Sequence, residues 1–333
     1  MGLYSFLNSY SGMWVVQSVM HSLLAMIIIS LAVRAWRIET PLVKQRFYFL
    51  VVLAPTVSYQ LFQAVDPDRG SVGFRSGALF DSMRWLNLEL MGAVPFGSLL
   101  VLVLVLTSVV FLFQELLPVL KQTFSRRMPE LEYAVSVPDP RIKEAMEGLP
   151  GEKPEVHVLS EDELLLFSRV GRSPAIFLST GLLNGLAPDE LRAALAHEMA
   201  HIKRARRPTL VLIFVLRVLM FFNPVILLEF RRIVQEEEKI CDDRSTLITG
   251  NPQALAKTLS RFHYPAEDAP KGLSRITAIG GMLEKYSHNF LIDSRIKRLS
   301  GLPDGRAAGK PERHFFKLFL TFLAILSLSY FVV

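Results

Sequence analysis

The segment His197-Glu198-Met199-Ala200-His201 forms an H-E-x-x-H motif. On a helix, histidines four residues apart project from the same face, so both imidazoles can reach one metal ion. Glu198 lies beside them, where its carboxylate can act as general base on a catalytic water. The motif predicts a catalytic zinc site that includes His197 and His201. The alternative is an amphipathic helix with two surface histidines.

A catalytic zinc ion takes three protein ligands and keeps one open position, so the third ligand should come from another element. The acidic run Glu236-Glu237-Glu238-Lys239-Ile240-Cys241-Asp242 offers such a ligand. At a spacing of four residues, Glu238 and Asp242 share one face of a helix. Two interpretations stay open. Either Glu238 binds the metal while Asp242 accepts a hydrogen bond from a ligand histidine, or the run is a solvated acidic face.

The elements that position these residues can be predicted from their boundaries. Pro188-Asp189 predicts the start of the histidine helix, which continues to about Arg206. Asn223-Pro224 predicts the start of the acidic helix, which ends at Gly250. We also predict a short helix after Asp139-Pro140 and three strands, Val156–Leu159, Leu164–Val170 and Ala175–Ser179.

Long apolar segments explain why the chain is 51% hydrophobic and only 20% charged over its 333 residues. Such segments exclude both a wholly soluble protein and a disordered one. A helix needs about 20 apolar residues to cross a bilayer. We predict a membrane region over residues 1–120 with spans at about 13–35, 47–65 and 91–120, and a last span over 314–333. Residues 121–313, between the third and last spans, have the composition of a folded domain.

Basic residues near the ends of the spans predict the orientation of the chain. The amino-terminal tail has no Lys or Arg, whereas the first loop and both flanks of the 121–313 domain are basic. We therefore expect both termini outside, this domain in the cytoplasm, and a bacterial cytoplasmic (inner) membrane as the location. The net charge of +6 follows the membrane boundaries, so no nucleic-acid partner is expected. The basic residues concerned are Arg34, Arg37, Lys44, Arg46, Lys121, Arg126, Arg127, Lys310, Arg313 and Lys317.

The segment between the two site helices is too short to cross the membrane twice. Thr209–Phe222 is apolar apart from Arg217, and its 14 residues make about 21 Å of helix. A complete crossing would also place Glu238 on the opposite side of the membrane from His197. We therefore predict a short membrane-associated hairpin over about residues 208–230, which either lies against the protein or enters the bilayer interface.

Three stretches of sequence resemble known membrane zinc peptidases. The segment STGLLNGLAPDELRAALAHEMAHIKR is similar to the one leading into the active-site helix of peptidases related to CAAX prenyl proteases and heat-shock membrane proteases. The Phe222-Asn223-Pro224 turn and the Glu238-x-x-Cys241-Asp242 pattern resemble the peptidases that act as β-lactam sensor–transducers, whose four-span layout also matches. Ser294-Arg295-Ile296-Lys297-Arg298-Leu299 is similar to an R-I-x-x-L element of both groups.

The sequence also departs from both groups. It has too few residues after the motif for the two full spans of the prenyl proteases, and it shows no extracellular sensor domain after the last span. We therefore do not expect direct β-lactam sensing.

The resemblance implies an α-helical multi-pass membrane protein with about four transmembrane helices and a cytoplasmic, mainly-α, α+β zincin-type (gluzincin) domain. It implies that one Zn²⁺ is bound by His197, His201 and Glu238. It also implies that Glu198 is the general base and that Asp242 supports a ligand from behind.

The resemblance also places a histidine and an arginine in the region of His288 and Arg295. Either these two residues stabilise the oxyanion during catalysis, or they are ordinary surface residues.

We expect an integral-membrane zinc metalloendopeptidase whose partners are the lipid bilayer and a membrane-associated protein or peptide substrate. One alternative is a signal-transducing peptidase that cleaves a cytosolic regulator. Another is a non-catalytic zinc-bearing membrane scaffold, although structural zinc sites normally fill all four positions with protein ligands. The substrate and the oligomeric state stay open.

Overall fold

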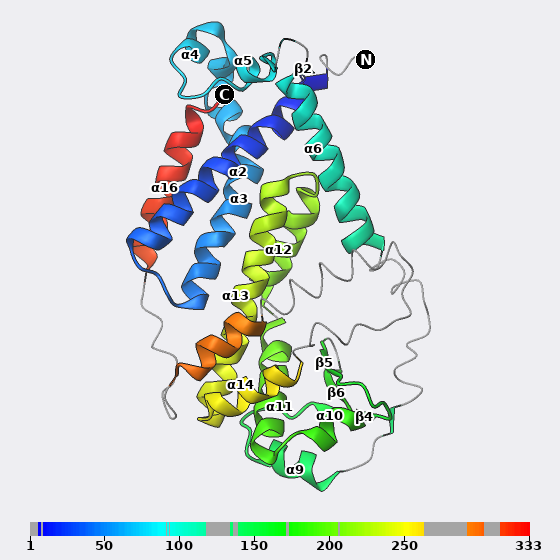
Figure 1. The fold of residues 1–333 in the computed structure, drawn as a ribbon. Coiled ribbons are helices and arrows are strands. Elements are labelled where there is room, and N and C mark those ends of the chain that lie inside the picture. Colours follow the sequence, from blue (N-terminus) through cyan, green and yellow to red (C-terminus); the bar gives the residue numbers. More distant parts are fainter. Residues whose placement is uncertain are drawn as a thin grey trace. The chain divides into compact units, whose positions relative to one another are not determined.

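The computed structural model describes residues 6–7, 9–90, 92, 94–117, 134–135, 139–170, 173–205, 207–262, 292–302 and 314–333. Within them the chain is mostly helical and divides into two compact units, whose ribbons Figure 1 colours along the sequence. The membrane unit comprises Met1–Arg126, Thr209–Glu237 and Pro311–Val333. The α/β unit comprises Arg127–Pro208 and Glu238–Lys310.

Three helical segments of the membrane unit are long and apolar enough to cross a bilayer. They are α2 (Tyr10–Ala35), α3 (Pro41–Val65) and Phe96–Gln114, which contains α6 (Phe96–Phe111) and enters the π-helical turn η2 (Leu112–Leu116). They correspond to three of the four predicted spans. At the position of the fourth, α16 (Phe315–Tyr330) is apolar but has 16 residues, fewer than the roughly 20 that a crossing requires. Three spans are therefore supported, and a count of four is not established.

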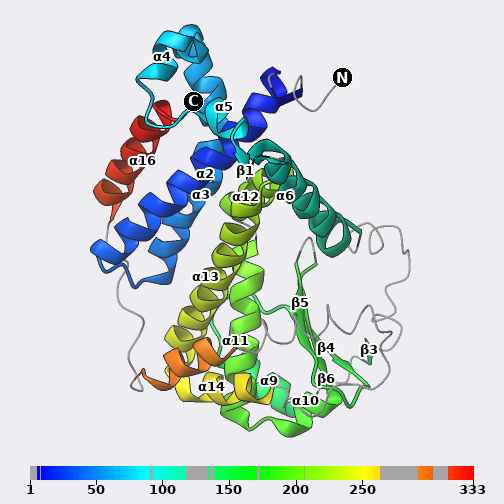
Figure 2. The same ribbon diagram turned by 45° about the horizontal axis from the view of Figure 1, so that its top comes forward.

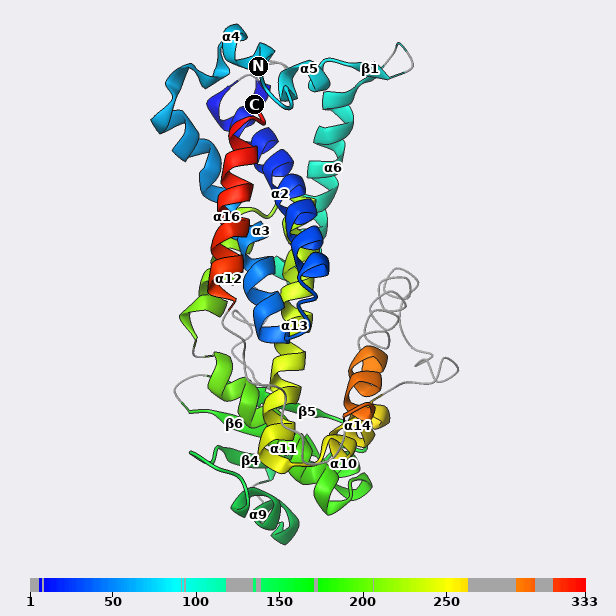
Figure 3. The same ribbon diagram turned by 90° about the vertical axis from the view of Figure 1, so that its left-hand side faces the viewer.

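Helices α2, α3 and α16 pack together, as Figures 1 and 3 show. Ile29, Phe47 and Ile325, one from each helix, meet in a single buried cluster. The segment that joins α3 to α6 folds against the residues after α16, where Phe80 and Val332 form a parallel β-bridge. That segment contains η1 (Pro67–Gly70), α4 (Val72–Ser76), α5 (Ser82–Leu86), β1 (Glu89–Leu90) and β2 (Val94–Pro95).

The short apolar hairpin consists of α12 (Pro208–Leu219) and the first half of α13 (Pro224–Thr249), both labelled in Figure 2. Ile213 of α12 and Ile233 of α13 lie in the same buried cluster. Asn223 at the tip of the hairpin is fully buried. The Asn223 amide nitrogen donates to Ser22 Oγ at 3.0 Å and to the Ser18 carbonyl at 3.3 Å, both on α2. The tip of the hairpin therefore packs against the amino-terminal half of α2. After Pro208 and Thr209 at its start, the exposed side chains of α12 are apolar: Val211, Leu212, Phe214, Val215, Val218 and Leu219.

The α/β unit contains a four-stranded sheet of order β3-β4-β6-β5. β4 (Glu155–Leu159) and β6 (Ala175–Ser179) are parallel, while β5 (Leu166–Arg169) runs antiparallel to β6, and β3 (Ala134–Val135) antiparallel to β4. The three predicted strands are confirmed, and β3 is an addition. Helices α9 (Pro140–Glu147), α10 (Thr180–Gly185), α11 (Pro188–Ala205) and α14 (Pro252–Arg261) and the helical residues 292–300 complete the unit.

Helix α11 is packed on two sides, which fixes its rotation. Leu195 and Ile202 lie in the same buried cluster as Ile176 of β6. Ala193, on another face of α11, packs with Leu255 of α14. Because these contacts leave one face of α11 for other partners, they determine which side chains point toward α13.

Candidate metal centre

The H-E-x-x-H residues lie in the middle of α11. His197 and Glu198 are only 7% and 8% exposed, and His201 is partly exposed. The two imidazole rings meet edge to face with their centroids 4.7 Å apart, and their Nε2 atoms are 3.0 Å apart. The spacing of four residues therefore brings two potential ligand atoms to one point, as the sequence predicted.

Glu238 reaches the same point from α13. Its Oε2 is 3.6 Å from Nε2 of His197, and its Oε1 is 3.4 Å from Nε2 of His201. Farther along α13, the Ser245 hydroxyl donates to the Ala193 carbonyl of α11 at 2.8 Å, which holds the two helices together. The structure thus groups His197, His201 and Glu238 as potential metal ligands, with one ligand atom from each within 4.8 Å of the others.

These separations can be compared with what zinc requires. Bonds of about 2.0–2.2 Å with tetrahedral angles place two zinc ligand atoms roughly 3.3–3.6 Å apart. The two Nε2 atoms are 3.0 Å apart, and the two oxygens of Glu238 lie 3.4 Å (Oε1 to His201) and 3.6 Å (Oε2 to His197) from them. Two imidazoles and one carboxylate are also the donor types of a catalytic zinc site with an open fourth position. The residues present therefore fit a zinc ion without rearrangement of the backbone.

Asp242 supports the cluster from behind. It is fully buried, and its Oδ1 lies 3.1 Å from Nδ1 of His197. At this distance the Asp242 carboxylate favours a proton on Nδ1, which leaves Nε2 facing Glu238, the tautomer that a metal ligand needs. Burial disfavours a charged imidazole, but the nearby carboxylates of Asp242 and Glu238 outweigh it and raise the pKa of His197 to about 9. The two carboxylates thus favour a cation at this ring, whether a proton or a metal ion.

Arg295, from the helical residues 292–300, pairs with both acidic residues of the cluster. Its Nε and Nη2 donate to the two oxygens of Asp242 at 2.8 and 2.7 Å, and its Nη1 lies 2.9 Å from Oε2 of Glu238. Burial would raise the pKa of Asp242, but Arg295 and His197 outweigh burial and hold that pKa below its usual range. Nη2 of Arg295 is also 3.4 Å from Nε2 of His197, so the guanidinium borders the metal cluster.

One contact of the centre was not predicted from the sequence. The Sγ atom of Cys241 lies 3.5 Å from Nδ1 of His201, on the side of the ring away from Glu238. Cys241 is buried, and its position one residue before Asp242 is the sequence signal that could have pointed to this contact. His288, the other proposed oxyanion residue, lies outside the described residues.

Comparison with known proteins gives a consistent picture. Residues 87–251 match the family model described as BlaR1 peptidase M56. A "Protease HtpX homolog" of Methanopyrus kandleri is 25% identical over 202 residues, which cover 46% of this chain and 62% of the relative. A "Protease HtpX homolog" of Desulfotalea psychrophila is 44% identical over 62 residues, which cover 18% of this chain and 22% of the relative.

The matched regions thus span less than two thirds of either relative. The longer match, to the Methanopyrus kandleri protein, has a sequence identity of only 25%. They nevertheless confirm the resemblance to HtpX-like and BlaR1-like membrane zinc metallopeptidases that the sequence suggested. Together with the apolar helices, they support a membrane-associated protease.

Proposed function

We propose that this chain, which resembles the HtpX-like and BlaR1-like membrane zinc metallopeptidases, is an integral-membrane zinc metalloendopeptidase. The observation that carries the proposal is the convergence of His197, His201 and Glu238 within 4.8 Å, with the buried Glu198 next to the first ligand in the chain. Two histidines and a carboxylate leave room for a fourth position in a tetrahedral site, which a water or a substrate carbonyl occupies in catalytic zinc enzymes.

A bound zinc ion supplies a Lewis acid that polarises the scissile carbonyl and acidifies the attacking water. Glu198 accepts the proton of that water on its carboxylate and delivers it to the leaving amine, so that one side chain serves as base and then as acid. Asp242 keeps the Nδ1 proton on His197 and thereby keeps Nε2 directed at Glu238.

Negative charge develops on the carbonyl oxygen during the attack and needs a hydrogen-bond donor. Arg295 is the described donor closest to this role, since its guanidinium borders His197 and Glu238. We retain His288 as the second proposed donor on the basis of the sequence resemblance.

An extended substrate has an edge of the sheet to pair with. Among the described strands, β5 has a single neighbour, β6, so the backbone groups on its other side can pair with a peptide. Binding of this kind recognises backbone rather than side chains, which suits a peptidase with several protein substrates.

We further propose that the chain crosses a bacterial cytoplasmic membrane with both termini outside and residues 121–313 in the cytoplasm. The basic residues after the first and third predicted spans support this orientation. The substrates are accordingly proteins or peptides at or in the membrane.

The experiment that tests the proposal compares membranes from cells that carry the wild-type protein or Glu198→Gln. Mass spectrometry of newly formed protein termini should find membrane-proximal cleavage products with the wild type alone. If the two strains give the same termini while the variant is present at wild-type level, the proposed activity is wrong.

A further inference from the structure

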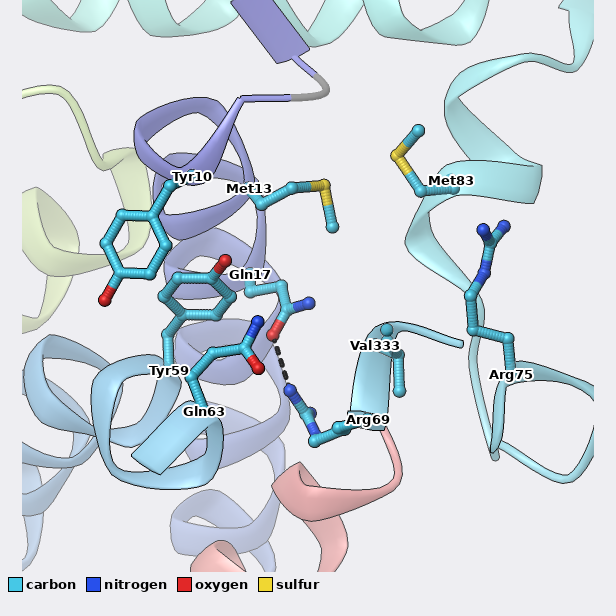
Figure 4. Close-up of a pocket in the computed structure, with 10 residues that line it drawn as sticks. Tyr10, Met13, Gln17, Tyr59, Gln63, Arg69, Arg75, Met83 and Val333 are labelled. Atoms are coloured by element: carbon cyan, nitrogen blue, oxygen red, sulfur yellow. Dashed lines mark hydrogen bonds between the residues drawn. The ribbon is translucent and has the colours of Figure 1, made fainter. Parts of the chain in front are cut away.

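The membrane unit contains a cavity of about 360 Å³ that holds none of the predicted catalytic or metal-binding residues. Figure 4 shows it between the amino-terminal turns of α2 and the end of α3 on one side and the segment 69–83 on the other, with Val333 between them. This volume lies at the lower end of the range of small-molecule sites, about 300–1,000 Å³. Its size therefore admits a small organic ligand.

A buried cation forms one wall of this cavity. The Arg69 side chain is 1% exposed and donates to Gln17 Oε1 at 2.9 Å and to the backbone carbonyls of Ser329, Tyr330 and Val332. A guanidinium has five N–H donors, so four hydrogen bonds leave one N–H on Nη1 without a partner among the described residues. Burial lowers the pKa of Arg69 to about 10, which still leaves it charged at neutral pH.

Two more buried side chains contribute hydrogen-bonding groups to the same wall. Gln17 is 2% exposed and uses its Oε1 for Arg69, and its amide nitrogen has no partner in the described part of the chain. Tyr59 is 3% exposed, and its hydroxyl likewise has no described partner. In Figure 4 the Gln17 amide nitrogen and the Tyr59 hydroxyl point toward the open space beside Met13. These three groups belong to mostly buried residues and border the same cavity, so an occupant rich in acceptors would match them.

The charge of the cavity lining indicates that a ligand rich in acceptors would also be anionic. Its charged lining side chains are two arginines, and no acidic side chain lines it, while the backbone end of Val333 in the lining accepts a hydrogen bond from the Ser82 N–H. Arg75 is neutralised by a bidentate pair with Asp81 at 2.9–3.1 Å, whereas Arg69 has no carboxylate within ion-pair distance among the described residues. A buried charge is stabilised by a counter-charge, which an anionic ligand would provide.

The remaining lining residues indicate that the rest of the ligand is apolar. Met13 and Met83 face each other across the opening in Figure 4, and the Tyr10 ring packs on Tyr59 at 5.1 Å. Methionine side chains adapt to apolar groups of different shapes. An occupant of this cavity therefore meets donors and positive charge at one end and apolar surface at the other.

We propose that this cavity binds a small amphiphilic carboxylate. Its carboxylate accepts hydrogen bonds from Arg69, Gln17 and Tyr59, and its apolar body lies between Met13 and Met83. The carboxylate comes either from a short soluble acid or from a fatty acid dissolved in the bilayer, because both share this chemistry.

Binding of radiolabelled octanoate to the full-length protein in phosphatidylcholine nanodiscs tests the proposal. We expect saturable binding of one octanoate per chain, with octanol competing at least tenfold more weakly because it lacks the charge. Competition by oleate placed in the nanodisc bilayer would identify a membrane fatty acid as the source, and competition by hexanoate alone a soluble acid. Equal competition by octanol, or no saturable binding, would overturn the proposal.

Matched variants locate the site. Gln63 lines the cavity, and its Oε1 is buried without a described partner, so the near-isosteric Gln63→Glu places a negative charge there. We expect it to weaken octanoate binding at least tenfold. Gln60→Glu makes the same charge change on the same helix at an exposed position outside the lining and should bind as the wild type does.

A second variant covers the case in which Gln63→Glu does not fold. Met83→Trp fills the cavity without changing charge, and Leu31→Trp, at an exposed position of α2 outside the lining, is its control. Loss of binding in Met83→Trp alone supports the site. Wild-type binding in a folded Met83→Trp protein contradicts it.

Discussion

Arg295 donates hydrogen bonds to both carboxylate oxygens of Asp242, at 2.8 and 2.7 Å, although the two residues are 53 positions apart. Asp242 is fully buried, so this pair compensates a charge that water does not reach. Because Asp242 also contacts His197, the pair orients a proposed metal ligand. Arg295 therefore acts on the centre through Asp242 as well as through any contact with substrate.

Removing this guanidinium should destabilise the α/β unit. A buried ion pair that loses one partner costs about 3–5 kcal/mol, because a charge stays buried without compensation. We expect Arg295→Ala to lose this amount and Arg295→Lys, which keeps the charge but not the bidentate geometry, to lose less. Unfolding of the detergent-solubilised protein by denaturant measures the difference. Arg298→Ala, which removes the more exposed pair with Asp243, is the control and should lose about 1 kcal/mol or less.

Glu238 and its neighbour Glu237 should differ sharply in their effect on bound metal. Glu238 lies at the histidine cluster, whereas the Glu237 carboxylate accepts a hydrogen bond from Gln45 at 2.7 Å. Glu238→Gln should lower zinc affinity by at least 10-fold, since it removes the proposed anionic ligand. Glu237→Gln should leave zinc affinity unchanged. Chelator competition followed by elemental analysis of the purified protein gives both values, and equal zinc loss in the two variants would remove Glu238 from the site.

Glu198 should affect turnover and not metal content. General acid–base catalysis contributes about 10²- to 10⁴-fold to a rate, so Glu198→Gln should slow cleavage of an unfolded test protein by that factor. Its zinc content should equal that of the wild type, because Glu198 is not one of the proposed ligands. Asp189→Asn, at an exposed position in the first turn of the same helix, serves as the control. Wild-type turnover in a zinc-loaded Glu198→Gln protein would exclude Glu198 as the base.

The packing of the hairpin tip against α2 can be tested by substituting Asn223. Asn223→Ala removes two hydrogen bonds that the side chain donates to α2, and also the cap that its Oδ1 gives to the Val225 N–H at the start of α13. Hydrogen bonds of this kind within membranes contribute about 0.6–2 kcal/mol each, so we expect the two bonds to α2 to account for a loss of about 1–4 kcal/mol. Mixed-micelle unfolding in increasing dodecyl sulfate measures it. Gln114→Ala, which removes an exposed contact with Arg231, should change stability little. A larger loss for Gln114→Ala than for Asn223→Ala would contradict the buried seat.

Much of the α/β unit could be predicted from the sequence, because local signals determine its elements. Pro188 and Pro224 begin α11 and α13 as predicted, and Asp139 caps α9 through its side chain. The spacing of four between His197 and His201 sufficed to bring their Nε2 atoms together, since helix geometry is regular. β3 was missed because two residues carry no detectable alternation of polar and apolar side chains.

Contacts between distant segments could not be predicted in the same way. The pairing of Arg295 with Asp242, the contact of Cys241 with His201 and the seat of Asn223 on α2 depend on tertiary packing, which no local pattern encodes. The apolar stretch that predicted a span over residues 314–333 likewise forms a helix of only 16 residues. Composition indicates that a segment is apolar, but the point at which a helix ends depends on its partners.

The buried tip of the hairpin has a consequence for how the protein is made. Arg217 and Glu229 are fully buried on either side of Asn223, so this segment is too polar and too short to be released into lipid by itself. Its partners on α2 and α3 are synthesised first. We therefore expect the hairpin to join the membrane unit only after α2 and α3 have been inserted, so that insertion of this chain follows the order of translation.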